Sequence, residues 1–178
     1  MIKRQTTHLL AASILAASLY TLTSCQEHKV YHAYAHMQQT EWNREDSVHF
    51  MVPAMKEPGR YQMETDLRIT RQYPFMGMTL IIDRTVISPA EKSHLRKRTF
   101  HADTIHCQLT DKSGRSMGRG VSYLQYEYPV STFNLNEGDS MVICVRHNMK
   151  QETLAGVSDI GVSMKKVESS KWKVASGK

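Results

Sequence analysis

Apolar and polar residues alternate along most of the chain after residue 30, with the period of two that is typical of β-strands with one face toward water. The clearest case is residues 61–69, where Tyr61 and every second residue after it are apolar or threonine, while the residues between them are Gln, Glu, Asp and Arg. Residues 141–147 repeat the pattern, with His147 on the apolar side. The pattern predicts seven to nine short strands, the principal ones at 31–37, 47–52, 61–69, 78–87, 99–109, 121–130, 141–147 and 160–167.

The segments between these strands are rich in turn-forming residues. Pro58-Gly59, the Asp-Lys-Ser-Gly run that ends at Gly114, and the Asn-Glu-Gly-Asp run that ends at Asp139 are examples. With no long amphipathic helix, the fold class is all-β, an antiparallel β-sandwich that is jelly-roll-like, with an immunoglobulin-like topology as the alternative. We expect the sandwich at 42–168, a tether and first strand at 25–41, and a disordered polar tail at 169–178.

The N-terminal region predicts export and lipid attachment. Lys3-Arg4 precedes an apolar run of about 14 residues that ends near Leu22, too short for a membrane span of roughly 20 residues. Leu-Thr-Ser-Cys25 follows this run and resembles the lipobox of bacterial lipoproteins. We therefore expect a signal peptide at 1–24, and a mature chain that begins at an acylated Cys25 and is held to a membrane by several acyl chains.

Size and charge limit the classes of partner. The chain of 178 residues carries 23 Lys and Arg against 17 Asp and Glu. Removing residues 1–24 leaves 154 residues, enough for one domain with a real core, and a net charge of +4. An exported lipoprotein does not meet nucleic acid, so we assign the basic runs, such as those at 96–98 and 165–166, to solvated loops, with a weak attraction to anionic lipid headgroups as the alternative.

Two cysteines remain after Cys25. Cys107 and Cys144 both lie in apolar strands, in a compartment where disulfides persist. A cross-strand disulfide and two separately buried thiols are both open, and we expect the separate thiols, because spacing alone does not provide disulfide geometry.

The search for catalytic chemistry finds no motif. The chain lacks a Gly-x-Ser-x-Gly elbow, a His-Glu-x-x-His zinc motif, a Cys-x-x-Cys pair and a phosphate-binding loop. His28, His32 and His36 are four residues apart, a spacing that suits a metal on a helix, but we prefer a first strand with the histidines facing outward. His147 is expected to be a neutral histidine bonded to a backbone carbonyl. We expect no enzyme activity, cofactor or metal.

Four ordered groups of residues resemble the gliding-motility lipoprotein H family, GldH. The match runs from about Val30 to Val167, after the lipobox. The chain departs from the expected pattern at Ser116-Met117, where an aromatic residue is expected. The four groups are Trp42 with Asp46-Ser-Val-His-Phe50; Leu67-Arg68, Tyr73-Pro-Phe75 and Leu80; Asp111 to Gly120; and His147-Asn-Met-Lys, Leu154-Ala-Gly-Val and Asp159-Ile-Gly-Val162.

The resemblance implies a non-enzymatic cell-envelope lipoprotein, an accessory of the gliding and protein-secretion machinery that acts through protein contacts. It implies no catalytic residues. Gln26, in place of an aspartate after Cys25, favours the outer membrane. The alternative function is a glycan-binding or substrate-capture lipoprotein, with small-molecule ligands not expected. As residues that bind a partner protein we expect Arg68, Tyr73, Phe75, Arg119 and His147.

Overall fold

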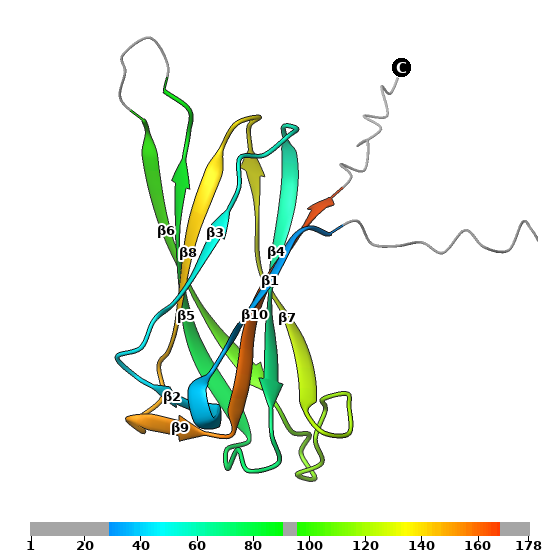
Figure 1. Cartoon of the computed structure of the whole chain (residues 1–178). Coiled ribbons are helices and arrows are strands. Elements are labelled where there is room, and N and C mark those ends of the chain that lie inside the picture. Colours follow the sequence, from blue (N-terminus) through cyan, green and yellow to red (C-terminus); the bar gives the residue numbers. More distant parts are fainter. Residues whose placement is uncertain (1–28, 91–95, 168–178) are drawn as a thin grey trace, which may run out of the picture.

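The computed structural model describes residues 29–90 and 96–167, so the predictions for the signal peptide, Cys25 and the tail at 169–178 lie outside the described residues. Two four-stranded antiparallel sheets make up the sandwich (Figure 1), and the prediction of an all-β antiparallel sandwich is confirmed.

Sheet A contains, in spatial order, β1 (Lys29–His36), β10 (Val157–Val167), β4 (Gly59–Ile69) and β7 (Leu124–Leu135). Sheet C contains β3 (Val48–Val52), β8 (Ser140–His147), β5 (Gly77–Ile87) and β6 (Arg98–Gln108). The short strands β2 (Glu41–Asn43) and β9 (Thr153–Ala155) form sheet B, and a 3-10 turn, η2 (Gln38–Thr40), precedes β2.

The strands pair in a nested order. β5 pairs with β6, β4 with β7, β3 with β8, β2 with β9, and β1 with β10. The chain is therefore one long antiparallel ribbon that is folded over on itself, which is the winding of a jelly roll. This order selects the jelly-roll topology over the immunoglobulin-like alternative.

The strand register defines two ends of the sandwich. At the proximal end β1 begins and β10 ends, since Lys29 lies opposite Lys165, and Val167 lies opposite Arg60 at the start of β4. The β5–β6 connection lies at this same end, near the top of Figure 1. The distal end is the opposite one, where β1 ends and the long connection from β6 to β7 lies.

The core lies between the two sheets and follows the period of two in the sequence. On β4 the side chains of Tyr61, Met63, Leu67 and Ile69 are buried, as the alternation predicts. On β8 the predicted inward positions from Met141 to His147 are buried as well. Trp42 of β2 has no exposed surface, so sheet B covers the edge of the core with the tryptophan turned inward, as expected for that residue.

The predicted strand boundaries are wrong at β7. The strand predicted at 121–130 begins only at Leu124 and continues past Pro129 to Leu135. The pairing with β4 shifts register between Met63 and Glu64, which places a bulge beside Pro129. Because β7 is the edge strand of sheet A, proline at this position costs no ladder hydrogen bond. The strands β2 and β9 were not predicted, since three residues are too few to show a period.

One buried cation joins the two sheets. Arg84 points inward from β5 and is 7% exposed. Its guanidinium donates to the Asp103 carboxylate on β6 and to the Ser131 hydroxyl on β7. It also lies 4.5 Å from the centre of the Phe133 ring, so a cation–π contact adds to the link between sheet C and sheet A.

The cysteines remain separate thiols. Cys107 is buried and Cys144 is half-buried, and both are free. Burial raises the pKa of the Cys107 thiol to about 12. On β6 Cys107 points into the core, whereas Cys144 occupies an outward position on β8, with β5 between the two strands. The disulfide alternative is therefore wrong for this chain.

Candidate functional site

The connection between β6 and β7, at the distal end, is the longest loop between two strands in the described residues. It begins with a tight turn in which the Asp111 carboxylate accepts hydrogen bonds from the backbone N–H groups of Ser113 and Arg115, at 2.8 and 3.0 Å. Gly114 completes the turn with a φ of 81°. The Ser113 hydroxyl also donates to this carboxylate, and its bond, together with the backbone bonds, lowers the pKa of Asp111. The turn predicted from the sequence is therefore stabilised by the carboxylate form.

The second half of the connection, residues 117–123, is held against the sandwich by a buried tyrosine. The Tyr126 hydroxyl donates to the carbonyl of Leu109 at 3.1 Å and lies 2.7 Å from the Ser116 hydroxyl. A Cβ at Gly118 would lie 2.5 Å from the Tyr126 ring, so only glycine lets the loop pass this close. Gly120 has a φ of 127°. Gly118 therefore serves close packing, and Gly120 serves the backbone conformation.

The loop presents apolar side chains to solvent. Met117 is 58% exposed, Val121 85% and Tyr123 47%. Arg119 lies among them and is also exposed. These four residues, which we call the 117–123 loop surface, combine side chains that are common at protein interfaces with an arginine.

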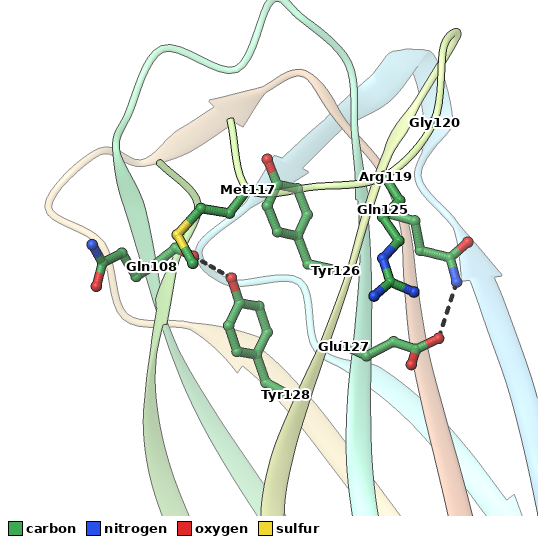
Figure 2. A pocket seen from close by; sticks show the side chains of 8 residues that line it. All are labelled: Gln108, Met117, Arg119, Gly120, Gln125, Tyr126, Glu127 and Tyr128. Carbon is green, nitrogen blue, oxygen red and sulfur yellow. Dashed lines mark hydrogen bonds between the residues drawn. The ribbon is translucent and has the colours of Figure 1, made fainter. Parts of the chain in front are cut away.

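Two shallow grooves lie on either side of this loop. Figure 2 shows the first, about 560 Å³ in volume, which is lined by Tyr126 and Tyr128 of β7 and by Met117 and Arg119 of the loop. The two tyrosine rings are nearly parallel, with an interplanar angle of 7°. The Tyr128 hydroxyl donates to the backbone carbonyl of Gln108, and burial raises its pKa.

The second groove, about 590 Å³ in volume, is lined by polar residues of sheet A and by the same loop. It contains Arg68 of β4, His36 of β1, Asp159 of β10, and Arg119 and Tyr123 of the loop. The register explains this gathering, because His36, Asp159, Arg68 and Gln125 are successive neighbours across the four strands. His36 Nδ1 lies 3.2 Å from an Asp159 carboxylate oxygen.

Arg68 is held in place without a carboxylate. Its guanidinium carbon lies 3.9 Å from the centre of the Tyr34 ring, and its Nε donates to the Gln125 side-chain oxygen at 3.3 Å. Within residues 29–90 and 96–167, neither Arg68 nor Arg119 forms an ion pair with Asp or Glu. The groove therefore offers two guanidinium groups whose bidentate donors suit a carboxylate.

A buried carboxylate next to Arg68 was missed by the sequence reasoning. Asp66 was assigned to the wet face of its strand, yet it has no exposed surface. One of its oxygens lies 3.0 Å from His32 Nε2, and the other has no partner among the described residues. A Cβ at Gly161 would contact both the Asp66 Cβ and the Tyr34 ring, so this glycine lets Tyr34 lie over Asp66. Burial raises the pKa of Asp66.

The outward-facing histidines of β1 confirm the strand interpretation of the His28, His32 and His36 spacing, although His28 lies outside the described residues. In the part of the chain that the structure describes, no group of three or more His, Cys, Asp or Glu residues is arranged to hold a metal ion. The same part contains no helix that is long and apolar enough to cross a membrane.

The five residues expected to bind a partner do not all reach the surface. Arg68 and Arg119 meet in the second groove, and Tyr73 and Phe75 line a third, smaller groove at the distal end. Tyr73 is only 8% exposed, because its ring packs edge-on against Phe75 and its hydroxyl donates to the backbone carbonyl of Gly77. Its expected role in binding a partner stays a prediction, and only a small part of its surface is available for it.

His147 is also buried, at 2% exposure, so its expected role in binding a partner stays a prediction that its burial does not favour. Its ring packs edge-on against Trp42, with the centroids 5.2 Å apart, and Nδ1 accepts a weak hydrogen bond from the backbone N–H of Met149. Burial lowers the pKa of His147, which favours the neutral ring. The neutral form agrees with the expectation, but the hydrogen bond to Nδ1 comes from a backbone N–H and not from the expected carbonyl partner.

Comparison with known structures adds little to this geometry. An aminopeptidase from a marine sediment Thaumarchaeota archaeon matches 69% of the chain at 11% identity, with a TM-score of 0.36. A CocE/NonD family hydrolase from Staphylococcus aureus matches 78% at 10% identity, with a TM-score of 0.31. The chain spans only 24% and 31% of those two proteins. The Eiger TNF of S. frugiperda is covered over 93% of its length, with a TM-score of 0.30.

Sequence comparison is decisive for the family. The Gliding motility lipoprotein GldH of Flavobacterium johnsoniae is 26% identical over 158 residues, which cover 84% of this chain and 92% of that protein. The family model described as GldH lipoprotein matches residues 29–164, which run from the start of β1 to within three residues of the end of β10. The resemblance stated from the sequence is thus confirmed, and the chain belongs to the GldH lipoprotein family.

Proposed function

We propose that this chain is a non-enzymatic accessory lipoprotein of a gliding or protein-secretion apparatus, and that it binds other envelope proteins through its distal end. The family assignment supports a cell-envelope lipoprotein. The 117–123 loop surface is the observation that carries the binding role. Three of its residues are large apolar side chains that are exposed without covering any part of the core.

The chemistry of this surface favours a protein partner. Apolar side chains around an arginine form the kind of central contact that provides most of the energy at protein interfaces. The loop is held in place by the Tyr126 hydrogen bonds and by Gly118, so a partner would not need to order it. Arg68 and Arg119 in the adjoining groove add two donors for acidic side chains of the partner.

The anchor follows from the N-terminal sequence. We infer that Cys25 carries the acyl chains and that the chain is held to the outer membrane, because Gln26 stands where an aspartate favours the inner membrane in some bacteria. β1 starts four residues after Cys25, at the proximal end. The anchor would therefore lie at the end opposite the 117–123 loop surface and leave that surface free for other proteins.

The test is crosslinking in intact cells that express the tagged lipoprotein. We expect the parent chain to capture components of the gliding or secretion machinery reproducibly, and a Cys25→Ala chain to lose them. A chain with both Arg119→Ala and Tyr123→Ala should lose the same components while remaining anchored and folded, as measured by membrane fractionation and thermal denaturation.

Met51→Ala is the matched control, because Met51 is 77% exposed but lies on β3, away from the loop. Its capture should equal that of the parent. If the double variant captures partners as well as Met51→Ala does, the loop surface is not the docking site. If the parent captures only bulk envelope proteins, and its tryptophan fluorescence shifts on addition of polysaccharide, the glycan-binding alternative replaces the proposal.

A further inference from the structure

The positive charge of the described chain is concentrated at its proximal end. The described residues carry seventeen Lys and Arg and fourteen Asp and Glu. Eight of these cations but only four of the acids lie at the proximal end, which leaves nine cations and ten acids for the rest. The cations are Lys29, Lys56, Arg60, Arg96, Lys97, Arg98, Lys165 and Lys166, and the acids are Glu57, Glu64, Glu137 and Asp139.

The acids at this end neutralise little of the charge near β6. Glu57 pairs with Lys166, and Glu64 pairs with Lys165. Asp139 is buried and accepts a hydrogen bond from the backbone of Asn136. Arg96, Lys97 and Arg98 are exposed and form no ion pair with any carboxylate of the described residues.

An exposed aromatic residue accompanies these three cations. The first five residues of β6 are exposed on both faces of the strand, because β6 is the edge strand of sheet C and this part of it extends past the packed region. Phe100 among them is 64% exposed. Cations beside an exposed aromatic ring suit the boundary between lipid headgroups and acyl chains.

The position of the anchor brings this end close to a membrane. Lys29, the first residue of β1, is four residues after Cys25, so the connecting chain reaches at most about 14 Å. Electrostatic attraction to an anionic surface acts over a Debye length of about 8 Å at physiological salt. A tether this short allows the proximal end to come within that distance of the headgroups, where its cations are attracted to them.

We propose that the proximal end, centred on Arg96, Lys97, Arg98 and Phe100, is a second membrane contact that binds anionic lipid headgroups and orients the sandwich. This inference rests on the proposed acylation of Cys25. Anionic lipid is the occupant because the basic surface lies at the tethered end. The contact keeps the sandwich upright on the membrane, with the proximal end against the headgroups and the 117–123 loop surface at the end that points away from them.

The test uses the acylated full chain, purified from membranes and reconstituted on vesicles of phosphatidylcholine, with or without a one-third share of phosphatidylglycerol. The measurement is the rate at which a membrane-impermeant maleimide labels a Phe100→Cys variant, and every variant also carries Cys144→Ser because Cys144 is a half-buried free thiol. Labelling should be several-fold slower on the anionic vesicles, and high salt should remove the difference. Met76→Cys is the matched control, since Met76 is 60% exposed at the distal end, and its rate should be the same on both vesicles.

Replacing Arg96, Lys97 and Arg98 together with Gln should abolish the slowing at position 100, because each cation near an anionic surface strengthens the attraction by about fivefold. Equal labelling of Phe100→Cys on both vesicles, or slowing that the Gln variant retains, would overturn the proposal.

Failure of the anchor gives a different result. A chain that floats with neither kind of vesicle overturns the acylation and this contact together, whereas flotation with anionic vesicles alone supports the contact without the anchor.

Discussion

The Arg84 link between the sheets provides a sharp test of the packing, because the chain contains a matched ion pair on the opposite face of the same sheet. Arg84 and Asp103 have side chains that are 8% and 28% exposed. Arg146 and Asp83 form a bridge of 2.7 Å on the outer face of sheet C, with side chains 42% and 15% exposed. Both pairs join neighbouring strands, so they differ mainly in burial and in what else the arginine contacts.

The two arginines should contribute very different amounts to stability. Removing one partner of a fully buried pair costs about 3–5 kcal/mol. Since Asp103 retains some contact with water, we expect Arg84→Met to cost about 2–3 kcal/mol, which includes the hydrogen bond to Ser131 and the contact with Phe133. Arg146→Met breaks a bridge near the surface and should cost at most about 1 kcal/mol.

The assay is urea unfolding followed by tryptophan fluorescence, which reports on Trp42 in the core. The two variants should keep the urea dependence of the parent, so that the change in midpoint measures the loss of free energy of unfolding. An Asp103→Asn variant should also be destabilised, because Asn keeps the shape but removes the charge opposite a buried guanidinium. If Arg146→Met costs as much as Arg84→Met, burial does not determine the strength of these pairs, and the reasoning is refuted.

Three further predictions concern single positions. Gly156→Ala should destabilise the chain by more than about 2 kcal/mol in thermal denaturation, since Gly156 has a φ of 86° and its Cβ would lie 2.4 Å from the backbone nitrogen of Tyr73. Gly114→Ala, with a φ of 81° but open space around it, should cost only about 1 kcal/mol, and an equal loss in both would contradict the steric argument. Tyr73→Phe should lower stability by about 1 kcal/mol through its lost hydroxyl bond and leave partner capture unchanged. Asp66 has a raised pKa in the folded chain, so its contribution to stability is full below its unfolded pKa and is lost as pH rises through the folded pKa. Urea unfolding at several pH values should show that Asp66→Asn removes this decline in the free energy of unfolding. A pH profile equal to that of the parent would contradict the prediction.

The sequence was sufficient for the parts of the fold that depend on local periodicity. The alternation in β4 and β8 predicted which side chains face the core, and the family resemblance was recognisable from ordered groups of residues. The end of β7 was predicted wrongly, because a strand can continue past Pro129 only where it lies at a sheet edge, which is a property of the whole topology.

The candidate site depended even more on contacts between distant residues. Asp66 alternates like an exposed residue, but Tyr34 and His32 from β1 cover it, and nothing near Asp66 in the sequence records that. His147 and Tyr73 carry polar groups that suggest a surface, yet each is buried by an aromatic neighbour. The 117–123 loop was recognised for its glycines, whereas its exposed apolar side chains became informative only once the core was known.

The nested strand order has a consequence for the time course of folding. β5 and β6 are joined by a short connection and can pair as soon as both have crossed the membrane, and each later pair brings together segments farther apart in the sequence. Contacts of this kind make folding slow. β1, next to the proposed lipid attachment point, has only β10 as its strand partner, so the first strand to be made can pair only after the last one. In a chain truncated before Val157, β1 would have no strand partner and β4 would have an open edge. Unpaired strand edges of this kind promote aggregation.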